Sequence, residues 1–137
     1  MDPQAFMKAR LDRGAVPLAV GDVLALVVLL TIGTLNHLPA SFLIDNPTHL
    51  LGVYAPFLIG WLLMAPLIGA YSAGAVETAK SSIPLVIRSW VPASVLGFVL
   101  REFVFAGGAS PVFVAIIFVT GLIALGGWRA LYFKLRG

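Results

Sequence analysis

The sequence contains no cysteine and carries little charge. None of its 137 residues is Cys, and 11% are Asp, Glu, Lys or Arg. The lack of cysteine excludes disulfides and thiolate metal sites. A soluble domain of this length needs a polar surface larger than its core, and so few charges do not supply it. The composition therefore indicates an integral membrane protein whose surroundings are the lipid bilayer.

The excess of basic residues does not indicate nucleic-acid binding. The net charge is +3, but the Lys and Arg residues flank apolar runs and form no stripe on a polar surface. Nucleotide-binding loops, nucleophile elbows and metallopeptidase signatures are missing from the sequence as well. The sequence thus gives no support for an enzyme and predicts neither a cofactor nor a metal site.

Long apolar runs are what the sequence does contain. It is 60% hydrophobic, with a mean hydropathy of +1.01. At roughly 20 residues per span, the length allows about four membrane helices in one domain. The predicted domain covers residues 1–137, with spans at about 16–36, 51–71, 84–106 and 111–130. The predicted fold is all-α, a polytopic membrane protein with four transmembrane helices.

The basic residues predict how these helices are oriented. They flank the two termini and the middle connection, and they are Lys8, Arg10, Arg13, Lys80, Arg88, Arg129, Lys134 and Arg136. The opposite side holds only Arg101. Because Lys and Arg concentrate on the cytoplasmic side of membrane proteins, both termini are predicted to be cytoplasmic in a multi-pass protein of the cell membrane. Tyr71 and Trp90 are then expected at the cytoplasmic interface, where amphipathic rings are favoured.

The second apolar run contains two prolines, Pro56 and Pro66. A proline inside a helix removes a backbone hydrogen bond and kinks the helix. Such kinks persist in a membrane where neighbouring helices or water satisfy the freed carbonyl. The two predicted kinks are either packing devices or elements that open a cavity.

Charged residues within these runs are costly, so each one needs an explanation. Asp22 lies roughly 7 Å inside the cytoplasmic boundary, counted from Pro17 at 1.5 Å per residue. Arg88 and Arg129 approach the same boundary from the third and fourth runs, and either side chain is long enough to reach Asp22. We interpret these three residues as a structural ion pair together with topology signals. A proton or cation site at Asp22 is the alternative.

Arg101 belongs to the opposite half of the bundle, roughly 20 Å along the helix from Arg88. Asn36 and His37, at the end of the first run, fall in the same outer layer. The orientation rule does not explain a positive charge there. We therefore take Asn36, His37 and Arg101, together with Asp22, as candidate residues for binding an ion or ligand, although Arg101 extending to outer headgroups is the alternative.

Several short motifs, taken in order, resemble one family. They are Gly21-Asp22, His37, Ala55-Pro56-Phe57 with Gly60-Trp61, Ala65-Pro66 with Gly69, Trp90 with Pro92, Arg101, and Trp128-Arg129-Ala130. This order is similar to that of a small prokaryotic four-helix integral membrane family, catalogued as a domain of unknown function in archaea and actinobacteria. The resemblance runs from about Pro17 to Leu131. It implies four helices and an inner-membrane location, and it implies no activity.

Three functions are compatible with these residues. The first is a small proton- or ion-coupled transporter or permeation unit, in which Asp22 carries a cation and Arg101 binds an anionic group. Four short helices enclose little volume, so this hypothesis calls for a homo-oligomer. The second is a non-catalytic accessory or structural subunit that docks a partner membrane protein. The third is a protein whose apolar interior binds a lipid, an isoprenoid or a pigment.

Overall fold

The structure of the protein is a computed structural model, and it describes residues 3–105 and 109–136. The regular elements in these ranges are all helical, and four of them are long and apolar enough to cross a membrane. In chain order they are α1 (Pro3–Arg10), the short 3-10 helix η1 (Arg13–Ala15), α2 (Val16–Leu35), α3 (Ala40–Asp45), α4 (Pro47–Ile68), α5 (Ala73–Glu77), α6 (Ala79–Phe103) and α7 (Pro111–Arg136). The predicted all-α membrane fold with four spanning helices is confirmed.

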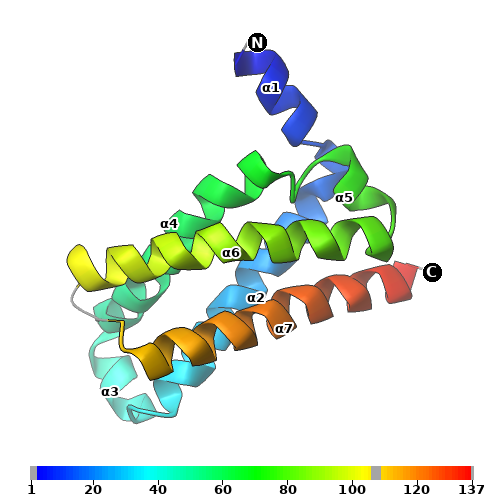
Figure 1. Ribbon diagram of the computed structural model, residues 1–137. Helices are drawn as coiled ribbons and strands as arrows, with labels where there is room; N and C mark the ends of the chain where they lie inside the picture. Colours follow the sequence, from blue (N-terminus) through cyan, green and yellow to red (C-terminus); the bar gives the residue numbers. More distant parts are fainter. Residues whose placement is uncertain (1–2, 106–108, 137) are drawn as a thin grey trace.

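The long helices α2, α4, α6 and α7 form an antiparallel ring in which each packs against two others (Figure 1). Because α7 returns to α2, the last long helix closes the ring on the first. One end of the bundle carries α3 and the start of α7, and we call it the α3 end. The opposite end carries α5 and the C-terminus, and we call it the α5 end. Helix α1 extends away from the bundle near the α5 end.

The ends of α4 differ from the second predicted span. The helix starts at Pro47, a residue that suits a first turn because its missing N–H would have no partner there. It ends at Ile68, because Gly69 adopts a left-handed conformation with φ 109° that stops a helix. Residues 69–71 therefore leave the helix axis, and Tyr71 turns back toward the bundle.

The third and fourth helices extend beyond the predicted runs. Thr78 and Ser81 form a reciprocal capping box that starts α6 at Ala79, ahead of Pro84. The predicted end of this span at residue 106 lies outside the described residues. Helix α7 continues to Arg136, beyond the predicted end at residue 130.

Helix α2 shows how the bundle separates its interior from the membrane. A stripe at four-residue spacing is buried, and it comprises Leu18, Asp22, Leu26, Leu30 and Thr34. A second stripe at the same spacing is exposed although it is apolar, and it comprises Val16, Val20, Leu24, Val28 and Ile32. An exposed apolar stripe on each spanning helix is what a lipid-facing surface requires, whereas a soluble bundle would place polar residues there.

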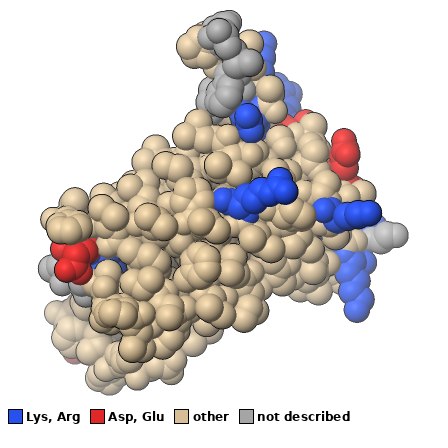
Figure 2. Space-filling model, in the orientation of Figure 1, with Lys and Arg blue, Asp and Glu red and all other residues tan. Residues whose placement is uncertain are grey.

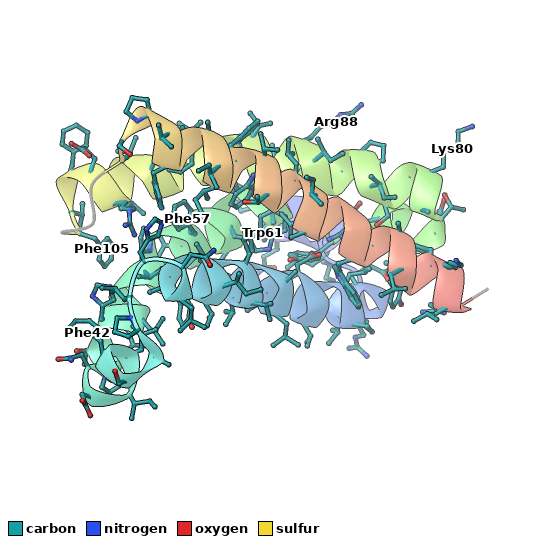
Figure 3. The ribbon with its side chains drawn as sticks, turned by 90° about the horizontal axis from the view of Figure 1, so that it is seen from below. Phe42, Phe57, Trp61, Lys80, Arg88 and Phe105 are labelled. Atoms are coloured by element: carbon teal, nitrogen blue, oxygen red, sulfur yellow. The ribbon has the colours of Figure 1, made fainter. Side chains whose placement is uncertain are left out.

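Helices α4 and α6 are held together by aromatic side chains and by a close backbone approach. The ring centroids of Phe57 and Trp90 lie 6.4 Å apart, and those of Trp61 and Trp90 lie 6.5 Å apart. Figure 3 shows Phe57 and Trp61 pointing into the bundle. Gly60 faces Ala93 across this contact, and a Cβ atom on Gly60 would lie 2.4 Å from the Ala93 carbonyl oxygen.

Tyr71 and Trp90 do not expose their rings to a membrane interface, because both side chains are buried in the protein. Amphipathic rings are favoured at a membrane interface because their polar group finds water there. Here the polar groups find partners inside the bundle instead. The indole N–H of Trp90 donates to the carbonyl of Phe118 on α7 at 2.9 Å.

Candidate functional site

Asp22 and Arg129 form an ion pair inside the bundle. Both side chains are completely buried, and Arg129 Nη2 donates to Asp22 Oδ2. A second bond runs from Arg129 Nε to Asp22 Oδ1 at 3.2 Å. This two-point contact matches the planar guanidinium to the carboxylate and joins α2 to α7. Of the two arginines predicted as partners for Asp22, the structure pairs it with Arg129.

Further hydrogen bonds extend this pair into what we call the inner polar cluster: Asp22, Trp61, Tyr71, Ser82 and Arg129. The Tyr71 hydroxyl donates to Asp22 Oδ2 at 2.9 Å and accepts from Trp61 Nε1 at 2.7 Å. Arg129 Nη1 donates to Ser82 Oγ and to the Ala70 carbonyl, both at 3.0 Å. The cluster thereby links all four long helices and the turn after α4.

Tyr71 is a permanent donor in this cluster. Burial and the neighbouring Asp22 carboxylate raise the pKa of the Tyr71 phenol above its usual range. The hydroxyl therefore keeps its proton at physiological pH and stays available to the carboxylate. Tyr71 was placed at the membrane interface by sequence reasoning, so this role was missed. The sequence signal that could have indicated it is Gly69, because glycine favours the left-handed conformation that ends α4 there.

Arg88 does not join the cluster. Its side chain is exposed on α6, and Figure 3 shows it pointing away from the bundle in the same direction as Lys80. This placement agrees with the topology role proposed for Arg88 and not with the ion-pair role.

The predicted outer-layer residues meet at a cavity of about 600 Å³ at the α3 end, which we call the outer cavity. All four long helices contribute to its wall. Its polar lining consists of Thr34, Asn36, His37, His49, Arg101 and Ser110. The rest of the lining is apolar apart from Gly33, and it includes Leu30, Val53, Phe113 and Ile117. Asn36, His37 and Arg101 are thus brought together, whereas Asp22 is not among the lining residues.

Arg101 is partly buried in this wall. Its guanidinium carbon lies 4.3 Å from the centroid of the Phe113 ring, a cation–π contact between α6 and α7. This contact orients the side chain along the cavity wall. His49, in the first turns of α4, also lines the cavity, and its ring packs edge-on against Phe42. Sequence spacing gave no reason to place His49 beside His37, because the path of the α3 segment decides that distance.

Pro56 and Pro66 lie inside α4, and the helix continues through both. Pro56 is fully buried. Neither proline is among the residues that line the outer cavity. Their placement fits a packing role better than the opening of this cavity.

A family model described as "Protein of unknown function (DUF3054)" matches residues 19–132. Neither a curated protein nor a solved structure matches the chain significantly. The matched range includes the Asp22–Arg129 pair and Arg101, so it covers both polar layers. Since the match extends over most of the chain and reaches all four long helices, this chain belongs to the DUF3054 family of proteins of unknown function.

Proposed function

We propose that this membrane protein binds an anionic ligand in the outer cavity, with Arg101 as the main charged contact. The observation that carries the proposal is the convergence of Arg101, Asn36 and two histidines on a cavity of about 600 Å³ with an otherwise largely apolar wall. Binding sites for small molecules have this size and this mixture of apolar lining and few polar groups. Arg101 lies in the last turn of α6, at the end of the bundle where the positive-inside rule does not call for a positive charge, which favours a functional role for it.

We place the outer cavity on the non-cytoplasmic side of the cell membrane. On the face shown in Figure 2, most Lys and Arg side chains gather near α1 and the α5 end. The positive-inside rule then makes the α5 end cytoplasmic, with both termini. The ligand would reach the cavity from outside the cell or from the outer half of the bilayer.

This orientation predicts which introduced cysteines react from outside. The chain has no native cysteine, and Asp45 and Glu77 are exposed at opposite ends of the bundle. In intact cells a membrane-impermeant maleimide should label Asp45→Cys. It should label Glu77→Cys only after permeabilisation, because α5 faces the cytoplasm. The reverse labelling pattern would show that the cavity faces inward.

The structure supports binding more strongly than proton-coupled transport. Both oxygens of Asp22 already accept hydrogen bonds, from Arg129 and Tyr71, and its side chain is completely buried. A proton-carrying role would require this cluster to break. The inner polar cluster instead holds the four long helices together near the α5 end.

Arg101→Gln tests the proposed site. Isothermal titration of the purified protein with hexyl phosphate should show an affinity about tenfold to a hundredfold lower than for the unchanged protein, because one charge-assisted contact is lost. Arg101→Lys should recover part of the affinity, since the positive charge remains. Arg88→Gln, an exposed arginine on the same helix, is the matched control and should bind normally.

Thermal unfolding of Arg101→Gln checks that the loss is local. An unfolding midpoint close to that of the unchanged protein, combined with weak binding, supports the anion site. Equal binding by Arg101→Gln and the unchanged protein would refute it.

A further inference from the structure

We infer that the ligand is a long-chain anionic amphiphile that enters the outer cavity sideways from the membrane, between α2 and α7. This inference rests on the anion site proposed at Arg101. It adds the chemical class of the ligand and its route. The anionic head would lie at Arg101, and the apolar chain would lie along the surface seam between α2 and α7.

The first observation is that the wall of the outer cavity on α7 faces the membrane as well. Val112 and Ile116 line the cavity, yet they are 69% and 56% exposed. Opposite them on α2 is Gly33, where an added Cβ atom would meet nothing within 4 Å. Because glycine has no side chain, α2 leaves the cavity wall open at Gly33. The cavity is therefore bordered on this side by apolar residues that are exposed on the outer surface of the bundle.

The second observation is an apolar groove that continues along the same seam. It has a volume of about 710 Å³ and includes Val20, Leu24, Val28 and Ile32 of α2 with Ala124 and Trp128 of α7. Helices α2 and α7 lie side by side along it (Figures 1 and 3). From Ile32 to Val20 the groove is about 18 Å long at 1.5 Å per residue. This length exceeds half of a bilayer core of roughly 30 Å, which is the depth of one lipid chain.

The groove and the cavity are lined by adjacent residues of α2. Ile32 lines the groove, and Gly33 lines the cavity. An apolar chain that leaves the cavity past Gly33 would cross open space next to the end of the groove, because an added Cβ atom there meets nothing within 4 Å. The outer cavity supplies the polar contacts, and the groove supplies an apolar track with no charged residue in its lining.

Charge complementarity defines the head group. Among the described residues, the lining of the outer cavity includes Arg101 and no Asp or Glu. A phosphate monoester or carboxylate head would be attracted to the guanidinium and could accept hydrogen bonds from Asn36 and Ser110. A choline or ethanolamine group would find no carboxylate there. The site thus favours an anionic amphiphile over a zwitterionic one.

Photo-crosslinking with a tail-labelled ligand tests the route. The protein is placed in phosphatidylcholine nanodiscs with hexadecyl phosphate that carries a diazirine at the end of its chain. After irradiation, crosslinked residues are mapped by mass spectrometry. Crosslinks should concentrate on the α2–α7 groove and should be rare on the exposed α4–α6 face, for example at Leu62 and Val95. A uniform spread over all lipid-facing residues would overturn the inference.

Three comparisons make the result specific. Arg101→Gln should give about tenfold fewer groove crosslinks, because the head loses its main contact. Gly33→Leu should also lose them, because the new side chain fills open space between cavity and groove. Gly52→Leu is its control, since Gly52 has equally open surroundings and does not line the cavity. Hexadecylphosphocholine with the same diazirine should not crosslink preferentially in the groove. Normal groove crosslinking by both Arg101→Gln and Gly33→Leu would overturn the inference.

The experiment separates this inference from the proposed function. Hexyl phosphate binding that depends on Arg101, together with crosslinks spread over all faces, would keep the anion site and refute the lateral route. No Arg101-dependent binding of hexyl phosphate or hexadecyl phosphate would refute both.

Discussion

Replacing Arg129 with methionine is expected to destabilise the protein by about 3–5 kcal/mol, because it leaves the carboxylate of Asp22 buried without its charged partner. Asp22 would keep the hydrogen bond from Tyr71. Ser82 and the Ala70 carbonyl would also lose their donor. The measurement is SDS-induced unfolding of the purified protein in mixed micelles, followed by circular dichroism.

A double variant separates the missing partner from the missing contacts. In Asp22→Leu/Arg129→Met no buried charge remains, and replacing a buried ion pair by apolar residues is often close to neutral. We therefore expect the double variant to be clearly more stable than Arg129→Met alone. Arg88→Met, which removes an exposed arginine, is the control and should change stability little. If the double variant is less stable than Arg129→Met, the account of the pair is wrong.

Gly60→Ala is expected to cost about 1–3 kcal/mol, although alanine is normally the better helix former. The new methyl group would lie 2.4 Å from the Ala93 carbonyl oxygen and 3.3 Å from the Gly97 nitrogen. Both are backbone atoms of α6, so no side-chain rotation relieves the overlap. Helices α4 and α6 would have to move apart, which would also loosen the packing of Phe57 and Trp90.

The matched control for this prediction lies on the same helix. Gly52 has nothing within 4 Å of an added Cβ atom, so Gly52→Ala should be neutral or stabilising by up to about 1 kcal/mol. The two variants are compared in the same SDS unfolding assay. Equal stability of Gly60→Ala and Gly52→Ala would show that the α4–α6 contact tolerates a methyl group.

The spanning helices could be predicted from the sequence because the signal is local. Apolar runs of sufficient length identify a membrane helix without knowledge of its neighbours. The separation of Asp22 and Arg101 into two layers along the bundle was predictable from the rise per residue, and Asn36, His37 and Arg101 do line one cavity. The choice of Arg129 over Arg88 as the partner of Asp22 depends on how α6 and α7 are rotated about their axes. That rotation is a property of the packed bundle, and the sequence left it open.

Side chains near helix ends were harder to place. Hydropathy places Tyr71 at the interface because its apolar run reads as one continuous helix, whereas Gly69 ends α4 and returns Tyr71 to the core. His49 reached the outer cavity through the path of α3, which no spacing rule describes. In both cases a short irregular segment decided the position, and hydropathy carries little information about such segments.

The ion pair between Asp22 and Arg129 also has a consequence for the biosynthesis of the protein. Its two residues are 107 positions apart in the chain, so Asp22 enters the bilayer long before Arg129 has been translated. Until α7 is inserted, the nascent bundle holds an unmatched carboxylate among apolar helices. Insertion of the final helix is therefore the step that supplies the charged partner of Asp22, and a chain interrupted before α7 would retain a buried acidic group without that partner.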